Sequence, residues 1–357
     1  MKILLVGEFS GFFNNLADGL RVLGHEVFLA NTGDGLRKFN ADYNWKKWGN
    51  GYTGKVYGYF DLWSNRRLFK GYDVVQFISP YFIPTLFLNK RFIRYVKHNN
   101  SKVFWAACGS SDLIAKYWTE SVELRCGVYD YLRKITHDSG QMLRCERTEI
   151  VDYENWFIDQ IDGVIPTMFE YAEPFRNHPK NIGTIPFPIN IDKIEYKENI
   201  VEDKVVFYHG ITRPEKGTIY IQEAFGLMRD KYFNEAEFIC NNQLPYDQYI
   251  ELVNKTNVIL DQTNSFSSGM NGLITMAKGK ILMGGGDDHS INELGYVFCP
   301  IINITSNSKQ ICESIEYVMA RRNEILHIGA ESRRFIEMHH NYIDIARKYI
   351  EKWSITN

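Results

Sequence analysis

The segment Lys204-Val-Val-Phe-Tyr208 runs directly into His209-Gly-Ile-Thr-Arg213-Pro-Glu-Lys216-Gly217. Its first five residues are typical of a strand in a buried sheet, and the residues Thr218–Met228 that follow have helical periodicity. We therefore expect Arg213 and Lys216 in the loop between a strand and a helix, at the carboxyl end of the strand. Ligands of open α/β sheets bind at this edge.

Two further turns of this kind follow along the chain. The strand Asn257-Val-Ile-Leu-Asp261 precedes the turn Ser265-Phe-Ser-Ser-Gly269, which opens the helix Gly269–Ala277, and Ile281–Met283 leads into Gly284-Gly-Gly286. Backbone N–H groups at a helix start bind anions, Ser267 or Ser268 could cap the helix, and Gly269 lets the backbone approach a ligand. Together with the two cations, these turns predict a pocket for two linked phosphates. The R-x-x-K-G turn alone is more typical of an ordinary strand–turn–helix with solvated charges.

The N-terminus shows the same alternation of strand and helix. Ile3–Val6 is a continuous apolar run, Gly7-Glu-Phe-Ser-Gly11 is a turn, and Glu26–Ala30 is the next strand after a helix that ends at Gly24. A βαβ unit of this kind predicts an open parallel sheet. We therefore expect an α/β fold with two Rossmann-like, doubly wound parallel-sheet domains that face a cleft.

A Pro-marked, charged stretch after Ile185 divides the two predicted domains. The first domain is predicted to span residues 1–190 and the second residues 191–335. A helix over Phe335–Trp353 is predicted to carry residues 336–357 back onto the first domain.

Composition limits the classes of function. The chain has 357 residues, of which 45% are hydrophobic and 24% charged, and its net charge of −2 gives no overall attraction to nucleic acid. The six cysteines are scattered and never form C-x-x-C, which argues against a zinc site or a disulfide framework. The N-terminal apolar run is short for a signal peptide, and no stretch reaches the 18 apolar residues of a membrane span. We expect a cytoplasmic protein.

The order of these motifs resembles that of the GT-B glycosyltransferases. The residues that carry the resemblance are H-G-x-x-R-x-x-K-G at 209–217, D-Q at 261–262, M-A-K-G-K at 276–280 and G-G-G at 284–286. Within that fold the chain is most similar to glycosyltransferase family 4, whose members build bacterial capsule and lipopolysaccharide. The resemblance covers nearly the whole chain, and it is specific in the second domain and loose in the first.

The resemblance implies a retaining, metal-independent transfer of a sugar from a nucleotide-diphosphate sugar, without a cofactor. Arg213 and Lys216 would hold the pyrophosphate and stabilise the leaving group, where charge builds up during the reaction. The other residues expected at the donor are His209, Gly210, Gln262, Ser267, Ser268, Gly269, Met270 and Asn271. A lone histidine such as His209 is more often packed and hydrogen-bonded than bound to a ligand.

The chain departs from the family at two positions. The family signature has two glutamates with seven residues between them, the second just before the helix end that aligns with Met276-Ala277. Phe266 and Ile274 occupy these positions, and neither can bind a hydroxyl group. Asn264, Ser265, Asp287 and Asp288 are alternative sugar contacts in addition to Gln262 and Ser267, and the sequence does not choose among them.

The turns of the first domain are the expected acceptor site. The candidate acceptor-binding residues are Gly7, Ser10, Gly11, Gly109 and Ser110. Asp112 could orient an acceptor hydroxyl or act as a base, and it could equally cap the helix Leu113–Trp118. Gly7 and Gly11 could instead serve tight strand–helix packing.

The segment from Lys38 to Tyr72 alternates aromatic residues with Lys46, Lys47, Arg66 and Arg67. Such a face suits the water–lipid interface and a lipid-linked acceptor on the inner membrane surface, or it is a packed aromatic subdomain with a solvated basic face. The alternatives to a transferase are a sugar-nucleotide epimerase or phosphorylase, and a non-catalytic binding homologue. Binding of single-stranded nucleic acid is disfavoured by the overall charge.

Overall fold

The computed structural model describes residues 1–31, 39–45, 52–83, 85–109, 111–122, 124, 126–139, 141–211, 213–242 and 246–355. The chain divides into two compact units. Unit 1 comprises Met1–Glu120, Met142–Asn190 and Tyr342–Asn357, and unit 2 comprises Ser121–Gln141 and Ile191–Asn341. The chain passes from unit 1 to unit 2 after Asn190, which is also the predicted boundary between the domains. The boundaries after Glu120, Gln141 and Asn341 differ from the predicted domain limits.

Unit 1 is built around a parallel sheet with the strand order β3-β2-β1-β4-β5-β6 in its described residues. The strands are β1 Lys2–Val6, β2 Glu26–Asn31, β3 Tyr43–Asn44, β4 Val74–Phe77, β5 Lys102–Ala107 and β6 Gly163–Pro166. Ile3–Val6 is fully buried, as expected for a strand covered on both faces. The order reverses between β1 and β4, which is the doubly wound arrangement that the sequence predicts.

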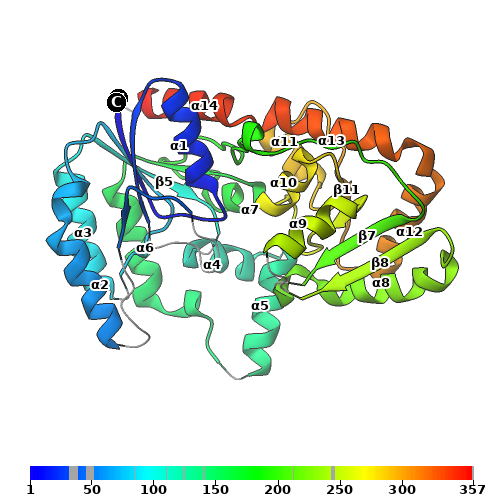
Figure 1. Cartoon of the computed structure of the whole chain (residues 1–357). Helices are drawn as coiled ribbons and strands as arrows, with labels where there is room; N and C mark the ends of the chain where they lie inside the picture. The colour runs from blue at the N-terminus through cyan, green and yellow to red at the C-terminus, as the bar shows by residue number, and fades with distance from the viewer. Residues whose placement is uncertain are drawn as a thin grey trace. The chain divides into compact units, whose positions relative to one another are not determined.

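Most helices of unit 1 lie between these strands in sequence, and the last two follow β6 (Figure 1). Their bounds are α1 Phe12–Val22, α2 Tyr52–Ser64, α3 Leu86–His98, α4 Asp112–Glu120, α6 Thr148–Gln160, α7 Phe169–Ala172 and α14 Tyr342–Ile355. Short 3-10 helices are η1 Arg66–Phe69, η2 Arg144–Glu146 and η3 Glu173–Phe175.

The C-terminal helix of unit 1 packs against α1. A Cβ atom on Gly19 of α1 would lie 2.3 Å from the carbonyl oxygen of Tyr342, so only a glycine allows the two helices to approach this closely. The prediction of one helix over Phe335–Trp353 is wrong in one respect. The chain forms α13 Ile325–His339 in unit 2 and α14 in unit 1. His340 lies outside both helices, and its ring nitrogen bonds the hydroxyl of Tyr296 at 2.9 Å.

Unit 2 contains a second parallel sheet, with the strand order β11-β10-β9-β7-β8 in its described residues. The strands are β7 Val205–Gly210, β8 Ala236–Asn241, β9 Val258–Leu260, β10 Ile281–Gly284 and β11 Ile302–Asn303. The helices are α5 Gly127–Asp138, α8 Thr218–Lys231, α9 Tyr246–Lys255, α10 Met270–Ala277, α11 Asp288–Leu294, α12 Ser308–Ala320 and α13, with 3-10 helices η4 Ile191–Lys193, η5 Pro214–Lys216 and η6 Arg322–Glu324.

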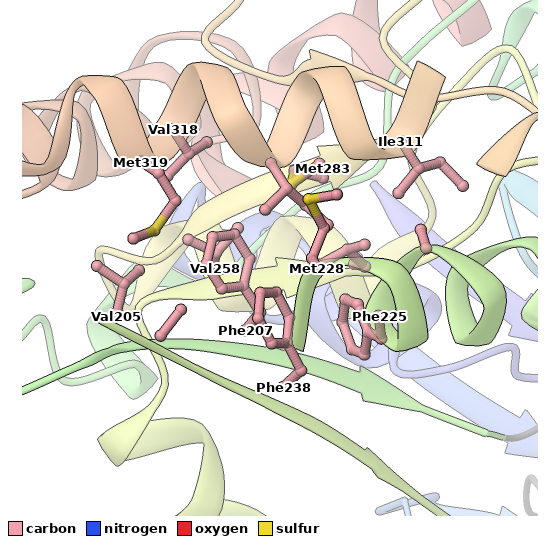
Figure 2. Packing of buried hydrophobic residues seen from close by; sticks show 14 of the residues in the cluster. Val205, Phe207, Phe225, Met228, Phe238, Val258, Met283, Ile311, Val318 and Met319 are labelled. Atoms are coloured by element: carbon pink, nitrogen blue, oxygen red, sulfur yellow. The ribbon is translucent and has the colours of Figure 1, made fainter. Parts of the chain in front are cut away.

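The core of unit 2 forms where α8 and α12 cover the sheet (Figure 2). Phe207 of β7 and Phe238 of β8 stack with ring centres 5.1 Å apart, and Phe225 of α8 packs on Phe238 at the same distance. Ile311 and Val318 of α12 complete the cluster. This apolar layer holds the strands in register and so sets the positions of the loops at their carboxyl ends.

One segment departs from the predicted domain limits. Residues 121–141, which the sequence assigns to the first domain, belong to unit 2. The backbone N–H of Val128 donates to the carbonyl oxygen of Asn264 at 3.0 Å, and Gly127 lies close enough to Asn264 that a Cβ would sit 3.1 Å from its Cα. Helix α5 therefore packs on the loop after β9, a pairing of residues far apart in sequence.

Candidate functional site

The loop after β7 carries Lys216 into the interior of unit 2. Its ammonium Nζ lies 2.5 Å from Oδ1 of Asp261, and the two side chains are 9% and 8% exposed. The sequence predicts Lys216 as a phosphate ligand, whereas Asp261 enters only as a strand end and as part of the D-Q pair that carries the family resemblance, with no role in the site. The carboxylate is therefore a site residue that sequence reasoning missed, and its position directly before Gln262 at a strand end is the signal that could have found it.

Arg213 lies in the same loop but in a different environment. Its side chain is 60% exposed, and its Nε lies 3.6 Å from Oε1 of Glu215. The two cations thus differ in burial and in partner. The charge of Lys216 is balanced by Asp261 in the interior, whereas the charge of Arg213 lies at the surface beside Glu215.

The loop containing these cations is fastened to the loop after β9. The N–H of Thr263 donates to the carbonyl of Lys216 at 3.0 Å, and Nδ2 of Asn264 donates to the carbonyl of Glu215 at 2.8 Å. Gly217 adopts a φ of 77°, and a Cβ there would lie 1.9 Å from Oγ1 of Thr263. The glycine is thus required both by its backbone conformation and by the neighbouring loop.

His209, the predicted donor contact, is fully buried at the end of β7. Its Nδ1 lies 2.8 Å from the carbonyl oxygen of Leu260, and its Nε2 lies 2.9 Å from Oγ1 of Thr218. Because a carbonyl can only accept, Nδ1 carries the proton and Nε2 accepts from the threonine. Burial lowers the pKa of His209 and favours this neutral form. The histidine joins β7, β9 and the start of α8.

The second predicted turn opens helix α10. The N-cap residue is Gly269, so the prediction that Ser267 or Ser268 caps the helix is wrong. Ser268 instead donates to the carbonyl of Gly285 at 2.7 Å, and Gln262 donates through Nε2 to the carbonyl of Ser267 at 3.0 Å. A Cβ built on Gly269 would meet open space, so its backbone is accessible in unit 2. Met270 is buried and Asn271 is half-buried in the first turn of the helix.

The third predicted turn, Gly284–Gly286 after β10, has a packing role in this structure. A Cβ on Gly285 would lie 2.5 Å from the carbonyl oxygen of Ser267 and 2.7 Å from that of Ser265. Asp287, one of the alternative sugar contacts, is the N-cap of α11 and accepts from the N–H of His289 at 2.9 Å. The glycines let the two loops touch, and this requirement accounts for them without a ligand.

A cavity of about 220 Å³ lies among these loops in unit 2. It is smaller than the roughly 300–1,000 Å³ typical of sites for drug-sized ligands, which suits a single sugar ring. Its lining residues come from α5, the loops after β9 and β11, and the start of α11, and they are Gly127, Asp130, Thr263, Asn264, Ser265, Phe266, Asp287, Asn303, Ile304, Thr305 and Ser306. Two carboxylates, two amides and several hydroxyl groups therefore surround one space.

The two positions of the missing glutamates lie in different environments. Phe266 lines the cavity and packs edge-on against the ring of His289, with centres 5.7 Å apart. Ile274 is half-buried on α10 and is absent from the cavity lining. The cavity therefore offers an aromatic ring where the family pattern has a carboxylate.

In unit 1 the glycine turns follow β1 and β5. Gly7 has a φ of 99°, and a Cβ there would lie 2.2 Å from Cγ2 of Ile78, which favours the packing explanation. Ser10 and Gly11 also have positive φ, Gly109 lies near the ring of Phe9, and Ser110 lies outside the described residues.

Two glutamates that sequence reasoning missed, the half-buried Glu8 and the buried Glu154, hold these turns. Glu8 accepts from the N–H groups of Phe9 at 2.7 Å and Asn14 at 3.0 Å, at the start of α1. Glu154 accepts from the N–H groups of Asp112 at 3.0 Å and Leu113 at 2.9 Å, at the start of α4. Burial raises the pKa of both glutamates.

Asp112 is the first residue of α4, and its carboxylate serves neither as a cap nor as an isolated base. Oδ2 accepts from the hydroxyl of Tyr81 at 2.9 Å and pairs with Nε of Arg144 at 3.2 Å. Burial, with the nearby Glu154 and Asp112, raises the pKa of Tyr81, so the phenol stays protonated and donates.

Within the described residues the chain has neither a metal-binding cluster nor a membrane-spanning helix. No group of three or more His, Cys, Asp or Glu side chains is arranged to hold a metal ion. Among the helices that the structure describes, none is both long enough and apolar enough to cross a bilayer.

Comparison with solved structures identifies the fold. Sucrose-phosphate synthase from Thermosynechococcus elongatus superposes with a TM-score of 0.63 at 12% identity, covering 99% of this chain and 98% of that one. HepE from Anabaena, solved with UDP and glucose, gives 0.62 at 12% identity with 99% of each chain covered. A glycosyltransferase from Rickettsia africae gives 0.56 at 12% identity, covering 99% of this chain and 97% of that one. The chain has the GT-B fold, as the sequence predicts.

Sequence comparison adds nothing to this assignment. No family model matches the chain, and no curated protein matches it. At 12% identity the structural likeness establishes the fold alone, so the residues of the site carry the functional argument.

Proposed function

We propose that this protein is a glycosyltransferase that moves a sugar from a nucleotide-diphosphate sugar to a saccharide or lipid-linked acceptor. The observation that carries the proposal is the pair of loops at the carboxyl edge of the second sheet. Lys216 is held there by Asp261, and Oδ2 of Asp261 would lie 3.5 Å from a Cβ built on Gly272 in the first turn of α10. The HepE structure, which has the same fold, contains UDP and glucose and supports this type of donor.

In this proposal Lys216 and Arg213 bind the diphosphate and stabilise the leaving group. An ammonium group has three N–H donors, so Lys216 can bond Asp261 and still donate to phosphate oxygens. Arg213 is exposed and would exchange its surface pair with Glu215 for the ligand, and the N–H groups of Gly269, Met270 and Asn271 complete the anion site. Asp261 positions the ammonium and balances its charge until the donor binds.

The cavity beneath α5 is the proposed subsite for the donor sugar. Asp130, Asp287 and Asn264 offer oxygen acceptors to sugar hydroxyls, and Phe266 offers a ring face to the apolar side of the sugar. These groups would replace the two glutamates of the family pattern. The small volume of the cavity supports a donor sugar without a large substituent on its ring.

The remaining parts of the proposal follow the resemblance. They are retention of configuration, independence of a metal ion, an acceptor site on unit 1 that includes Asp112, a cytoplasmic location and a role in making cell-surface polysaccharide such as capsule or lipopolysaccharide. The acceptor turns after β1 and β5 support the placement on unit 1, since Phe9 of one turn lies beside Gly109 of the other.

A thermal-shift panel with UDP, GDP, ADP and CMP sugars tests the proposal. A ligand that binds the folded state raises Tm, and the rise should vanish in Lys216→Ala. Product analysis with the stabilising donor then separates sugar transfer from epimerisation. If no nucleotide sugar raises the Tm of the wild-type protein, the proposed donor site is wrong.

A non-catalytic homologue that binds the nucleotide sugar is the second candidate. It is favoured by Phe266 and Ile274, which leave both signature positions without a carboxylate. Donor-induced stabilisation without any transfer to an acceptor, and without hydrolysis or epimerisation, would support it.

A further inference from the structure

A surface of unit 1 that has no part in the donor site combines cations with exposed aromatic rings. We define the α2–α3 surface by Phe60, Arg66, Phe87, Lys90, Arg91 and Arg94. Helix α3 carries Lys90, Arg91, Arg94 and Lys97 and has no acidic residue over its length. The short helix η1, which follows α2, adds two further cations, Arg66 and Arg67.

The indole of Trp63 joins the two helices that form this surface. Arg91 of α3 lies over this ring at 4.3 Å from its centre, and Arg66 lies over it at 5.2 Å. Trp63 also packs against Tyr95 of α3, with ring centres 5.9 Å apart. The contact fixes both guanidinium groups on one aromatic support.

A second indole holds the other cations of α3. Lys90 lies 5.1 Å and Arg94 lies 5.3 Å from the ring centre of Trp156 on α6. The α2–α3 surface ends there, because α6 also exposes Asp152 and Asp159. Lys90, Arg91 and Arg94 therefore form a strip between two tryptophans, whereas Lys97 pairs with Asp162 at 2.6 Å.

Stacking on an indole leaves the charge of a cation uncompensated, whereas a salt bridge neutralises it. Among the described residues, no ion pair within 4.0 Å is recorded for Arg66, Lys90, Arg91 or Arg94. Nη1 of Arg66 donates to the carbonyl oxygen of Trp63 at 2.9 Å, and the other edge N–H donors of the stacked guanidinium groups are available for phosphate oxygens. The surface is thus preorganised to receive anionic groups.

Exposed phenyl rings flank the cations. Phe87 is 74% exposed and Phe60 is 58% exposed. Phe87 lies one helical turn before Arg91, and Phe60 lies one turn before Trp63, so both rings lie close to the Trp63–Arg91 contact. Burial of such rings in an acyl–headgroup boundary, next to cations at the headgroup level, is how peripheral proteins bind anionic bilayers.

We propose that the α2–α3 surface docks unit 1 on an anionic lipid bilayer. This inference extends beyond the proposed sugar transfer, and it deepens that function by placing the protein where a lipid-linked acceptor would lie. A bilayer is favoured over nucleic acid because the overall charge of −2 gives no long-range attraction to a polyanion in solution, whereas a membrane requires only one cationic face.

Vesicle flotation of the full-length protein tests the proposal. We expect wild type to float with vesicles of phosphatidylcholine mixed with phosphatidylglycerol, not with phosphatidylcholine alone, and to be released by salt. The variant Lys90→Gln/Arg91→Gln/Arg94→Gln should partition about 100-fold less, at about fivefold per cation. The control Lys255→Gln/Lys309→Gln/Lys348→Gln removes the same charge from exposed positions outside the surface and should float like wild type.

A second variant covers the case in which the charge variant fails to fold. Phe60→Ser/Phe87→Ser keeps every cation and should lower partitioning about tenfold or more, while melting as wild type does. The proposal is overturned if wild type does not prefer anionic vesicles, if both surface variants float like wild type, or if the control loses binding equally. Tighter binding to a single-stranded oligonucleotide than to vesicles would also overturn it. None of these readouts involves a nucleotide sugar, so failure here leaves the proposed function standing.

Discussion

The buried pair of Lys216 and Asp261 leads to an asymmetric prediction about its two partners. The pair has an Nζ–Oδ1 distance of 2.5 Å and is almost fully excluded from solvent. Removing one partner leaves the other as an uncompensated buried charge, which costs about 3–5 kcal/mol. We expect Lys216→Met and Asp261→Asn each to destabilise unit 2 by about 3 kcal/mol, which for a domain of this size lowers Tm by about 6–12 °C.

The two variants should respond in opposite ways to UDP. In Lys216→Met the phosphate ligand is gone and the carboxylate of Asp261 remains, so UDP should no longer raise Tm. In Asp261→Asn the diphosphate becomes the counter-ion of Lys216, and a repulsion of up to about 3 kcal/mol between a carboxylate and a phosphate about 5 Å apart is removed. UDP should therefore raise the Tm of this variant by more than it raises that of wild type.

Differential scanning fluorimetry over a range of UDP concentrations measures both effects. Lys231→Met is the matched control, because Lys231 and Glu316 form a pair with the same 2.5 Å separation on the exposed surface of unit 2. It should change neither Tm nor the response to UDP. A full UDP response in Lys216→Met, or an equal loss of response in both variants of the buried pair, would refute the assignment of Lys216 as a phosphate ligand with Asp261 as its resident counter-ion.

Three further predictions concern stability. Gly217→Ala should lower the free energy of unfolding by about 2–4 kcal/mol in a denaturant titration, because its φ is 77° and its Cβ would strike Oγ1 of Thr263. The control Gly226→Ala lies in α8, where a Cβ meets open space, and should raise the free energy of unfolding by about 0.5–1 kcal/mol. Burial lowers the pKa of Lys280 to about 8, so the unfolded chain binds more protons between pH 8 and 10.5 and stability should rise with pH there. Lys280→Met should remove up to about 3 kcal/mol of this rise. If the variant keeps the pH dependence of the wild-type stability, the lowered pKa of Lys280 is not its cause. Glu154→Ala should cost about 2–4 kcal/mol of stability, because it leaves the N–H groups at the start of α4 without an acceptor, and Glu154→Gln should cost an intermediate amount. Equal stability of the wild type and both variants would show that this cap is dispensable.

Much of the fold could be predicted because its strands are short apolar runs between glycine turns. Ile3–Val6 is buried on both faces, and in Val205–Tyr208 only Val206 is half-buried. Such strands need no partner information to be recognised. The loop from Arg213 to Gly217 could be located for the same reason, since it stands between a strand and a helix. What its cations contact could not be predicted, because Asp261 reaches Lys216 from another strand.

The place of residues 121–141 in unit 2 could not be predicted for a related reason. Gly127–Asp138 is an amphipathic helix on any local pattern, and nothing in its periodicity says which sheet will cover its apolar side. Its backbone bond to Asn264 depends on where the loop after β9 lies. The same holds for Phe266, whose position in the cavity depends on α5 and α11 as well as on its own loop.

The order of residues by itself determined the two parallel sheets, the change of unit after Asn190 and the turns at the strand ends, because hydrophobic period and glycine placement act over a few neighbouring residues. Tertiary structure alone decided that Asp261 neutralises Lys216, that Glu154 caps α4 and that α5 joins unit 2. These contacts join residues that are distant in the chain. They form only once the packed sheets have set strand register, and a charge or a donor then pairs with whichever group that register brings within reach.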